Sequence, residues 1–195
     1  MGLNWEFTGG ETELDPDELN GLLIPLIATR ADLDEYEQAN IQKARIGLAR
    51  RRITPNLLLS ETFIKRLHKM MYADVWKWAG TFRKTEKNIG VDPVHIAVDL
   101  RQLLDDARYQ LEHDTFSPDE FAIRLKHRLV SIHCFVNGNG RHARLFAELL
   151  IKSLGAEPFT WGAFSEIPDV REIYFTALRK ADRGDVKPLM VFARS

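Results

Sequence analysis

The stretch SPDEFAIRLKHRLVSIHCFVNGNGRHARLFAELLIKSLG, residues 117–155, contains the two helices on which the predicted fold depends. A serine, a proline and an acidic pair at 117–120 form a helix-start signature, with proline at the first helical position. Apolar residues then recur at helical spacing at Phe121, Leu125, Leu129 and Ile132. A loop at 137–140 precedes a second helical segment, which Gly155 should end because glycine accepts the left-handed conformation that commonly follows a helix. We therefore expect two helices joined by a loop of asparagine and glycine.

The segments on either side also favour helices, so the expected fold class is all-α. Asp15-Pro16 begins a helix that Pro25 kinks or ends, and Ser60 begins another that Gly80 stops. Further helices are expected at 31–51, from Asp92-Pro93 onward, and between Asp169 and Gly184.

Residues 81–91 lack helical periodicity. Thr, Phe and Ile are interleaved here with Arg, Lys and Glu, and Asn88-Ile89-Gly90 has the composition of a turn. This pattern predicts a short β-hairpin or an extended flap. The expected architecture is therefore a helical bundle with one small β flap.

The composition is that of a folded globular protein. The chain has 195 residues, of which 45% are hydrophobic and 28% charged, so it can bury a substantial core. The 27 basic and 28 acidic residues give a net charge of −1, so no overall field attracts nucleic acid or anionic membranes. Cys134 is the single cysteine, the first residues lack a signal-peptide or lipid-anchor pattern, and the apolar run at 22–28 is too short to cross a bilayer. We expect a cytoplasmic protein without membrane association.

The loop inside residues 117–155 has the chemistry of an anion site. The glycines of Gly138-Asn139-Gly140 allow successive backbone amides to turn toward one point, next to the positive end of the following helix. Arg141 and Arg144 lie three residues apart, so they project from one helix face and can hold phosphate oxygens. His133 precedes the loop and can accept a proton near neutral pH. A tight turn beside a solvated pair of arginines is the alternative, but the convergence of base, amides and arginines favours phosphate binding.

The string from His133 to Arg144 resembles the signature of the Fic family, His-x-Phe-x-(Asp/Glu)-Gly-Asn-Gly-Arg-x-x-Arg, at every defined position except Asn137. The similarity extends to 75–83 and 88–91 before the signature and to 174–189 after it. The resemblance implies a Fic-type helical bundle with a small β-hairpin flap. It divides the chain into an N-terminal helical extension at 1–55 and a Fic domain at 56–195. Within the family, the chain is most similar to the mobile-element Fic proteins called mobile mystery protein B, which implies a toxin–antitoxin setting.

This resemblance implies a protein adenylyltransferase, which transfers AMP from ATP to a hydroxyl side chain of a target protein. By position, His133 would deprotonate the hydroxyl. The phosphates of ATP would be held by Gly138, Asn139, Gly140, Arg141 and Arg144. The target would dock as an added β-strand on the flap residues Ile89, Gly90, Val91 and Asp92. Such a transfer needs a base, an in-line geometry and charge neutralisation.

Position 137 departs from the Fic signature, in which a carboxylate holds Mg²⁺. Mg²⁺ sites normally use one or two carboxylates together with substrate phosphates, and Asn137 offers only a neutral oxygen. Metal binding at Asn137 is therefore expected to be weak and to depend on the phosphates. Two alternatives stay open: another nucleotidyl- or phosphotransferase on the same scaffold, or a nucleotide-binding regulatory module with weakened catalysis.

Many Fic proteins carry an inhibitory helix of pattern (Ser/Thr)-x-x-x-Glu-(Gly/Asn), whose glutamate pairs with the second signature arginine, here Arg144. The nearest string, 153–157, is followed by Pro158 instead of Gly or Asn. Glu35 and Glu37 lack the preceding Ser or Thr, so we expect both to solvate a helix face. We therefore predict no strong inhibitory glutamate in the chain, and expect any restraint to come from a separate antitoxin or regulator protein, or from weak metal binding.

Lys43, Arg45 and Arg50-Arg51-Arg52 form a basic cluster. No interleaved aromatic residues and no helix-turn-helix pattern accompany them. We expect a solvated helix face there and no nucleic-acid partner.

Overall fold

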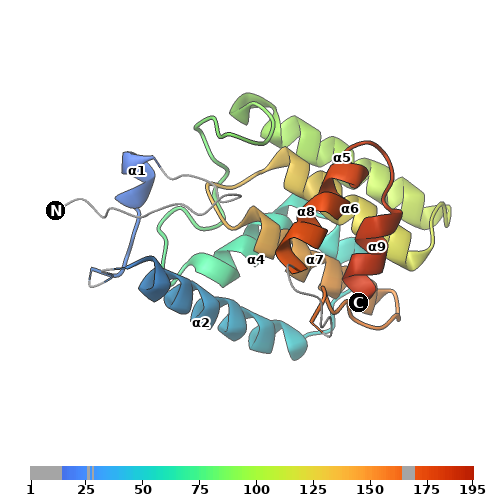
Figure 1. The fold of residues 1–195 in the computed structure, drawn as a ribbon, viewed down its shortest axis with the longest axis horizontal. Coiled ribbons are helices and arrows are strands. Elements are labelled where there is room, and N and C mark those ends of the chain that lie inside the picture. The colour runs from blue at the N-terminus through green and yellow to red at the C-terminus, as the bar shows by residue number, and fades with distance from the viewer. Residues whose placement is uncertain (1–14, 26, 28, 164–169) are drawn as a thin grey trace.

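The computed structural model describes residues 15–25, 27, 29–163 and 170–195, and within these ranges the chain is mostly helical (Figure 1). The helices are α1 Pro16–Leu19, α2 Arg30–Ala49, α3 Pro55–Leu58, α4 Glu61–Tyr72, the 3₁₀ turn η1 Pro93–His95, α5 Ile96–Glu112, α6 Pro118–Ile132, α7 Asn139–Ser153, α8 Val170–Ala181 and α9 Lys187–Arg194. The predicted all-α class is confirmed.

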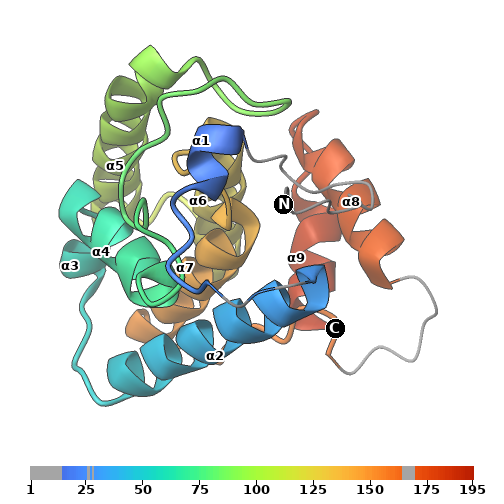
Figure 2. The same ribbon diagram turned by 90° about the vertical axis from the view of Figure 1, so that its left-hand side faces the viewer.

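Helices α6 and α7 form the centre of the bundle, with α3, α4 and α5 on one side and α8 and α9 on the other (Figure 2). Helix α2 runs along the edge of the bundle and packs on α4. The apolar stripe of α7 is fully buried at Phe146, Leu150 and Ile151. Because the helices of 117–155 are central, the loop between them is held from several directions.

Local cap signals placed the main helices correctly. The hydroxyl of Ser117 accepts a hydrogen bond from the backbone N–H of Glu120, and Asp92 caps η1 in the same way through Val94. Helix α2 also has a cap, because the hydroxyl of Thr29 accepts from the N–H of Asp32. These bonds satisfy amides that a helix start would otherwise leave without partners.

Two helices end earlier than predicted. α1 stops at Leu19 rather than near Pro25, and α4 stops at Tyr72 rather than Gly80. The two segments that follow them pair with each other: the N–H of Leu23 donates to the carbonyl of Val75 at 2.8 Å, and that of Lys77 donates to the carbonyl of Gly21 at 2.9 Å. If α1 and α4 continued to the predicted ends, these N–H and carbonyl groups would form hydrogen bonds within each helix. Here they form hydrogen bonds between the two segments instead.

Of the two forms predicted for residues 81–91, the extended flap is present and the β-hairpin is not. No strand is assigned in the described ranges, and Phe82 instead makes an isolated bridge with Phe135. Arg83 is buried, and its guanidinium donates to the carbonyl oxygens of His133, Thr85 and Val91. The segment is therefore an extended loop held to residues 132–135, because the side chain of Arg83 occupies the acceptors that a second strand would have used.

The C-terminal part contains α8, predicted between Asp169 and Gly184, and α9, which helical spacing alone did not predict. The capping position Asp169 lies outside the described residues. None of the helices described combines the length and the apolar character that crossing a membrane requires.

Candidate active site

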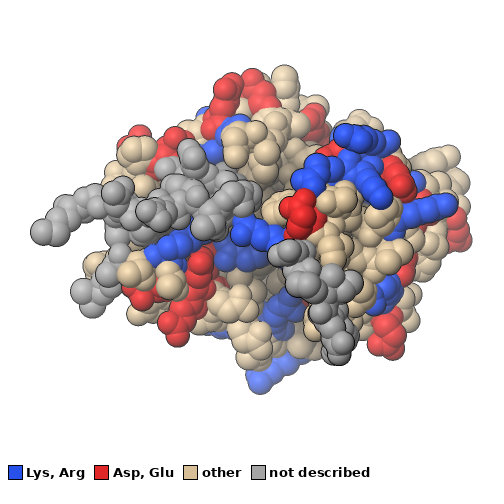
Figure 3. Space-filling view, in the orientation of Figure 1, with Lys and Arg blue, Asp and Glu red and all other residues tan. Residues whose placement is uncertain are grey.

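A cavity of about 700 Å³ lies where the α6–α7 loop faces α8, α9 and the start of α2. Its lining includes His133, Asn137, Gly138, Asn139, Gly140, Arg141, Arg144 and Ile89. The space-filling view shows basic side chains gathered at the centre of this face, beside a hollow (Figure 3). The tertiary structure therefore brings the predicted base, the predicted anion loop and both arginines to one cavity.

The loop is fixed by its own side chains. Asn139 clamps it, since the Oδ1 of Asn139 accepts from the N–H of Phe135 at 2.9 Å and its Nδ2 donates to the carbonyl of the same residue at 2.8 Å. Gly138 has a φ of 76°, and a Cβ there would lie 2.6 Å from the hydroxyl oxygen of Tyr72. Only glycine fits this position, and α7 begins immediately after it, so its first amides lack partners within the helix.

His133 ends α6 in the left-handed conformation, with a φ of 56°. Its side chain is buried, and the Nε of Arg83 donates to its carbonyl oxygen at 2.6 Å. Burial lowers the pKa of His133 to about 4, and the positive charges of Arg83 and Lys87 add to that effect. The imidazole is therefore neutral at pH 7 and can accept a proton. Arg83 is a positioning residue that sequence reasoning missed.

Arg141 is not free for phosphate. Its guanidinium makes an ion pair of 2.6 Å with the carboxylate of Glu37, which is only 2% exposed and also accepts from the indole N–H of Trp76 at 2.6 Å. The expectation that Glu37 solvates a helix face is wrong, whereas Glu35 is exposed as expected. Glu37 lies four residues after Leu33 and four before Ile41, both buried. That spacing was the available signal for its burial.

Arg144 lies over the ring of Tyr174, 5.2 Å from its centroid, and has no carboxylate partner in the part of the chain described. The hydroxyl of Tyr174 accepts from the Nζ of Lys126 at 2.6 Å. Lys126 is fully buried, and burial, with a further contribution from the charge of Arg144, lowers its pKa to about 7. Arg144 is thus the arginine of the pair that is available to an anion in the cavity. The sequence analysis did not predict a role for Lys126, because a lysine beside the apolar positions of a helix is normally exposed.

Asn137 does not present a metal site. Its Oδ1 accepts from the N–H of Gly138 at 2.5 Å, and its carbonyl oxygen accepts from the Nε2 of His68 at 3.0 Å. The N–H of Gly80 donates to the Nδ1 of His68, which fixes Nε2 as the protonated nitrogen. No group of three or more His, Cys, Asp or Glu side chains with metal-binding geometry occurs among the described residues. The donors present do not fit a protein-held Mg²⁺, because one amide oxygen that is already hydrogen-bonded is a poor substitute for carboxylates.

The predicted docking flap contributes one residue to the cavity. Ile89 is half exposed and lines it, while Gly90, Val91 and Asp92 do not. The N–H of Val91 donates to the carbonyl of Ile132 at 3.3 Å, and Asp92 caps η1. A Cβ at Gly90 would lie 2.6 Å from the Cβ of His133. The loop therefore forms a wall against the base.

Comparison with known proteins shows a similarity to one family. Residues 58–151 match the model of the Fic/DOC family. The chain is similar at 18% identity, with a TM-score of 0.70, to the BepC protein of Bartonella tribocorum solved with bound AMPPNP, over 92% of this chain and 97% of that one. It is similar at 24% identity, with a TM-score of 0.65, to Fic-1 of C. elegans, over 90% of this chain and 50% of that one. These likenesses establish the fold, and the match to the Fic/DOC family model covers residues 58–151, somewhat under half of the chain.

Curated relatives are similar over somewhat more than half of the chain. The protein adenylyltransferase Fic of Drosophila grimshawi is 30% identical over 117 residues, which are 58% of this chain and 23% of the relative. The protein adenylyltransferase fic-1 of Caenorhabditis elegans is 29% identical over 116 residues, which are 57% of this chain and 22% of the relative. The chain thus spans less than a quarter of the length of these relatives.

Proposed function

We propose that the protein is an adenylyltransferase that moves AMP from ATP to a hydroxyl side chain of a target protein. The observation that carries the proposal is one cavity that combines a neutral buried histidine, His133, with the start of α7 and the guanidinium of Arg144. Relatives named protein adenylyltransferases support it.

The reaction uses these groups as follows. The imidazole of His133 accepts the proton of the target hydroxyl, and the hydroxyl oxygen attacks the α-phosphorus of ATP. The bond between the α-phosphorus and its bridging oxygen to the β-phosphate breaks, and pyrophosphate leaves. The amides at the start of α7 and Arg144 neutralise the departing phosphates. The aromatic side chains of Tyr174, Phe175 and Trp161, which line the same cavity, form a wall for the purine ring.

Arg141 joins the phosphates only in competition with Glu37. A polyphosphate that reaches Arg141 has to compete with an ion pair whose carboxylate is buried and also hydrogen-bonded to Trp76. We propose that Arg144 binds the phosphates first and that Mg²⁺, when present, is held mainly by the phosphates of ATP. No step of the reaction above depends on a metal held by Asn137.

The partners follow from the chemistry. The target is a protein with an accessible Ser, Thr or Tyr hydroxyl, which docks beside Ile89. Membership of the mobile mystery protein B group, a cytoplasmic location and a separate antitoxin or regulator remain parts of the proposal.

Intact mass spectrometry tests the function. The protein is incubated with candidate target proteins and with each nucleoside triphosphate in turn, with and without Mg²⁺, and His133→Ala is the matched control. The expected result is the addition of one AMP per modified hydroxyl, with ATP only. A gain of UMP or of a single phosphate would replace the proposal with another transfer on the same scaffold. The absence of any gain, with ATP bound, would favour the regulatory module.

A further inference from the structure

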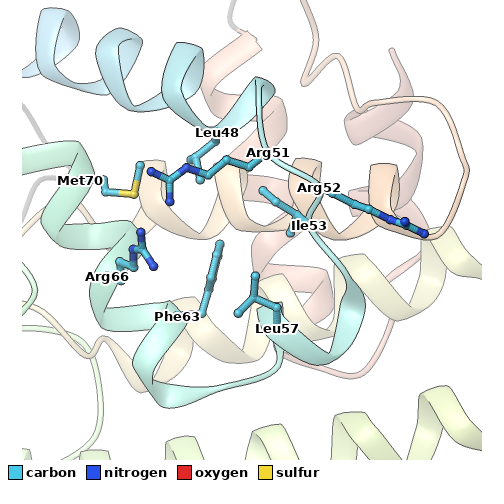
Figure 4. A pocket seen from close by; sticks show the side chains of 8 residues that line it. All are labelled: Leu48, Arg51, Arg52, Ile53, Leu57, Phe63, Arg66 and Met70. Carbon is cyan, nitrogen blue, oxygen red and sulfur yellow. The ribbon is translucent and has the colours of Figure 1, made fainter.

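A second pocket, of about 410 Å³, lies at the other end of α2 (Figure 4). It is bounded by Leu48 on α2, by Arg51, Arg52 and Ile53 in the segment that follows, and by α3 and α4. It shares no lining residue with the active-site cavity. Asp34 lines the first cavity and Leu48 the second, and at about 1.5 Å per residue these positions lie about 21 Å apart along the helix. We call this second pocket, lined by Arg51, Arg52 and Arg66, the arginine pocket.

The pocket carries three guanidinium groups that no described carboxylate neutralises. Arg51, Arg52 and Arg66 are exposed, and in the described ranges no ion pair joins any of them to an acidic residue. Among the described residues, none of those that line the pocket is acidic. In contrast, two other members of the basic cluster form ion pairs. The Nζ of Lys43 lies 2.6 Å from the Oδ2 of Asp74, and the Nη1 of Arg45 lies 2.7 Å from the Oε2 of Glu148. The basic cluster that the sequence suggested to be one solvated helix face therefore divides into two surfaces. In one of them Lys43 and Arg45 are paired with acidic residues, and in the other Arg51 and Arg52 line the pocket.

The positions of the arginines concentrate their charge. Arg51 and Arg66 extend toward the Met70 side of the pocket, and Arg52 extends away beside Ile53 (Figure 4). Like charges that lie close without a counter-ion repel each other, and an anionic group placed between them removes that repulsion. The rim of the pocket therefore favours an anion.

The centre of the pocket favours an apolar group. Leu48, Ile53, Phe63 and Met70 supply apolar lining, and Leu57 is 48% exposed at the edge. A ligand that satisfies both parts has a bulky apolar body and carboxylates on either side. A nucleic acid does not match, because the ring of Phe63 is only 6% exposed and offers no platform for base stacking.

We propose that the arginine pocket is a docking site for an acidic peptide segment of a partner protein, with one bulky apolar side chain inserted among Leu48, Ile53 and Phe63. The volume suits an anchor side chain with its flanking backbone, since small binding pockets begin at about 300 Å³. Charge complementarity with Arg51 and Arg66 selects an acidic segment over a neutral one. This inference does not rest on the proposed catalytic function.

Fluorescence anisotropy with labelled hexapeptide pools tests the proposal. The probe pool has Asp or Glu at its four outer positions and Phe, Leu or Trp at its two central positions. The full chain is expected to bind it with a Kd of about 100 µM or tighter, and to bind pools with serine at the outer or at the central positions at least about tenfold more weakly. Equal binding of all pools, or tighter binding of a single-stranded oligonucleotide, would overturn the proposal.

Charge reversal provides the matched variants. Arg51→Glu with Arg66→Glu should weaken binding of the acidic pool by about tenfold or more and should shift preference to a pool with lysine at the outer positions. Leu57→Ser should weaken binding with no shift of preference. Arg101→Glu, an exposed arginine on α5, should change nothing. If the double reversal folds normally by circular dichroism and still prefers the acidic pool, the arginine pocket is not the docking site.

Discussion

At the scale of single residues, the candidate chemistry depends on how one histidine is held. His133 lies in the left-handed conformation at the end of α6, its carbonyl is fixed by Arg83, and the residue lines the cavity. A non-glycine residue in this conformation is uncommon and is kept only where surrounding contacts determine it. The loop wall at Gly90 and the guanidinium of Arg83 provide those contacts.

The first prediction concerns the charge of His133. With a pKa of about 4, its imidazole is neutral from pH 5.5 to 8, so transfer should not vary with His133 ionisation in that range and should fall as the pH drops through 4 and the ring is protonated. His133→Ala should lower the transfer rate by about 100-fold or more while leaving the Kd for ATP unchanged. Rates by mass spectrometry and affinities by calorimetry test both statements. Undiminished transfer in the variant would remove His133 as the base.

The second prediction concerns Gly90. Its φ is 107°, and an alanine Cβ would lie 2.6 Å from both the Cβ of His133 and the Nη2 of Arg83, so Gly90→Ala should displace the base. A displacement of about 1 Å can lower a rate about 100-fold, so transfer should fall strongly while ATP still binds. Gly184→Ala is the matched control, because Gly184 has a φ of 93° but no atom of the described residues within 4 Å of its Cβ position. Equal activity in the two variants would contradict the role of the loop wall.

At the scale of elements, α2 is part of the site rather than an appendage. Its N-terminal end lines the active-site cavity, its middle supplies Glu37 to Arg141, and its C-terminal end lines the arginine pocket. The amide of Asn40 also bonds to α4, through the carbonyl of Met70 at 3.0 Å. These contacts hold a buried carboxylate against a predicted phosphate-binding arginine.

The third prediction follows from this helix. Glu37→Gln keeps an acceptor for the indole of Trp76 but removes the negative charge from Arg141, so the Kd for ATP should fall by about tenfold, or 1.4 kcal/mol. Glu35→Gln makes the same change of charge on the exposed face of α2 and should leave the Kd unchanged. Isothermal titration calorimetry measures both. The sequence predicted that both glutamates solvate a helix face, so that neither substitution would change the affinity for ATP. Equal Kd values for the two variants would support that earlier prediction.

At the scale of the whole molecule, the buried Lys126 links stability to pH. Below pH 7 its ammonium is charged in both the folded and the unfolded chain, and the folded state carries the full penalty of burying it. Between pH 7 and about 10, the folded state holds Lys126 neutral while the unfolded chain still binds a proton, so the free energy of unfolding rises with pH. The groups facing it are the hydroxyl of Tyr174, the ring of Trp161 and the charge of Arg144.

The fourth prediction measures this linkage. From pH 7 to 9, the free energy of unfolding of the unmodified chain should rise relative to that of Lys126→Met by up to about 1.4 kcal/mol per pH unit. Urea denaturation at fixed ionic strength gives both curves. Parallel curves would mean that Lys126 titrates normally in the folded state.

The sequence by itself determined the helices around 117–155 and the residues of the anion loop. Caps such as Ser117 and the i to i+4 recurrence of apolar residues are local signals, and the loop residues are adjacent in the chain, so no knowledge of packing was needed. The same locality explains why the helix starts at Asp15 and Ser60 were found, although their ends were misplaced.

The tertiary structure alone decided which charges are buried and what they touch. Glu37 and Arg141 are far apart in the chain, as are Arg83 and His133, and Lys126 and Tyr174. A helical pattern predicts which face of a helix is apolar, but the partner of a polar group on that face depends on which other element packs there, and a buried charge persists only beside such a partner. For the same reason the sequence left both a hairpin and an extended flap open at 81–91: the side chain of Arg83 takes backbone acceptors from residues 132–133, and no local pattern encodes that contact.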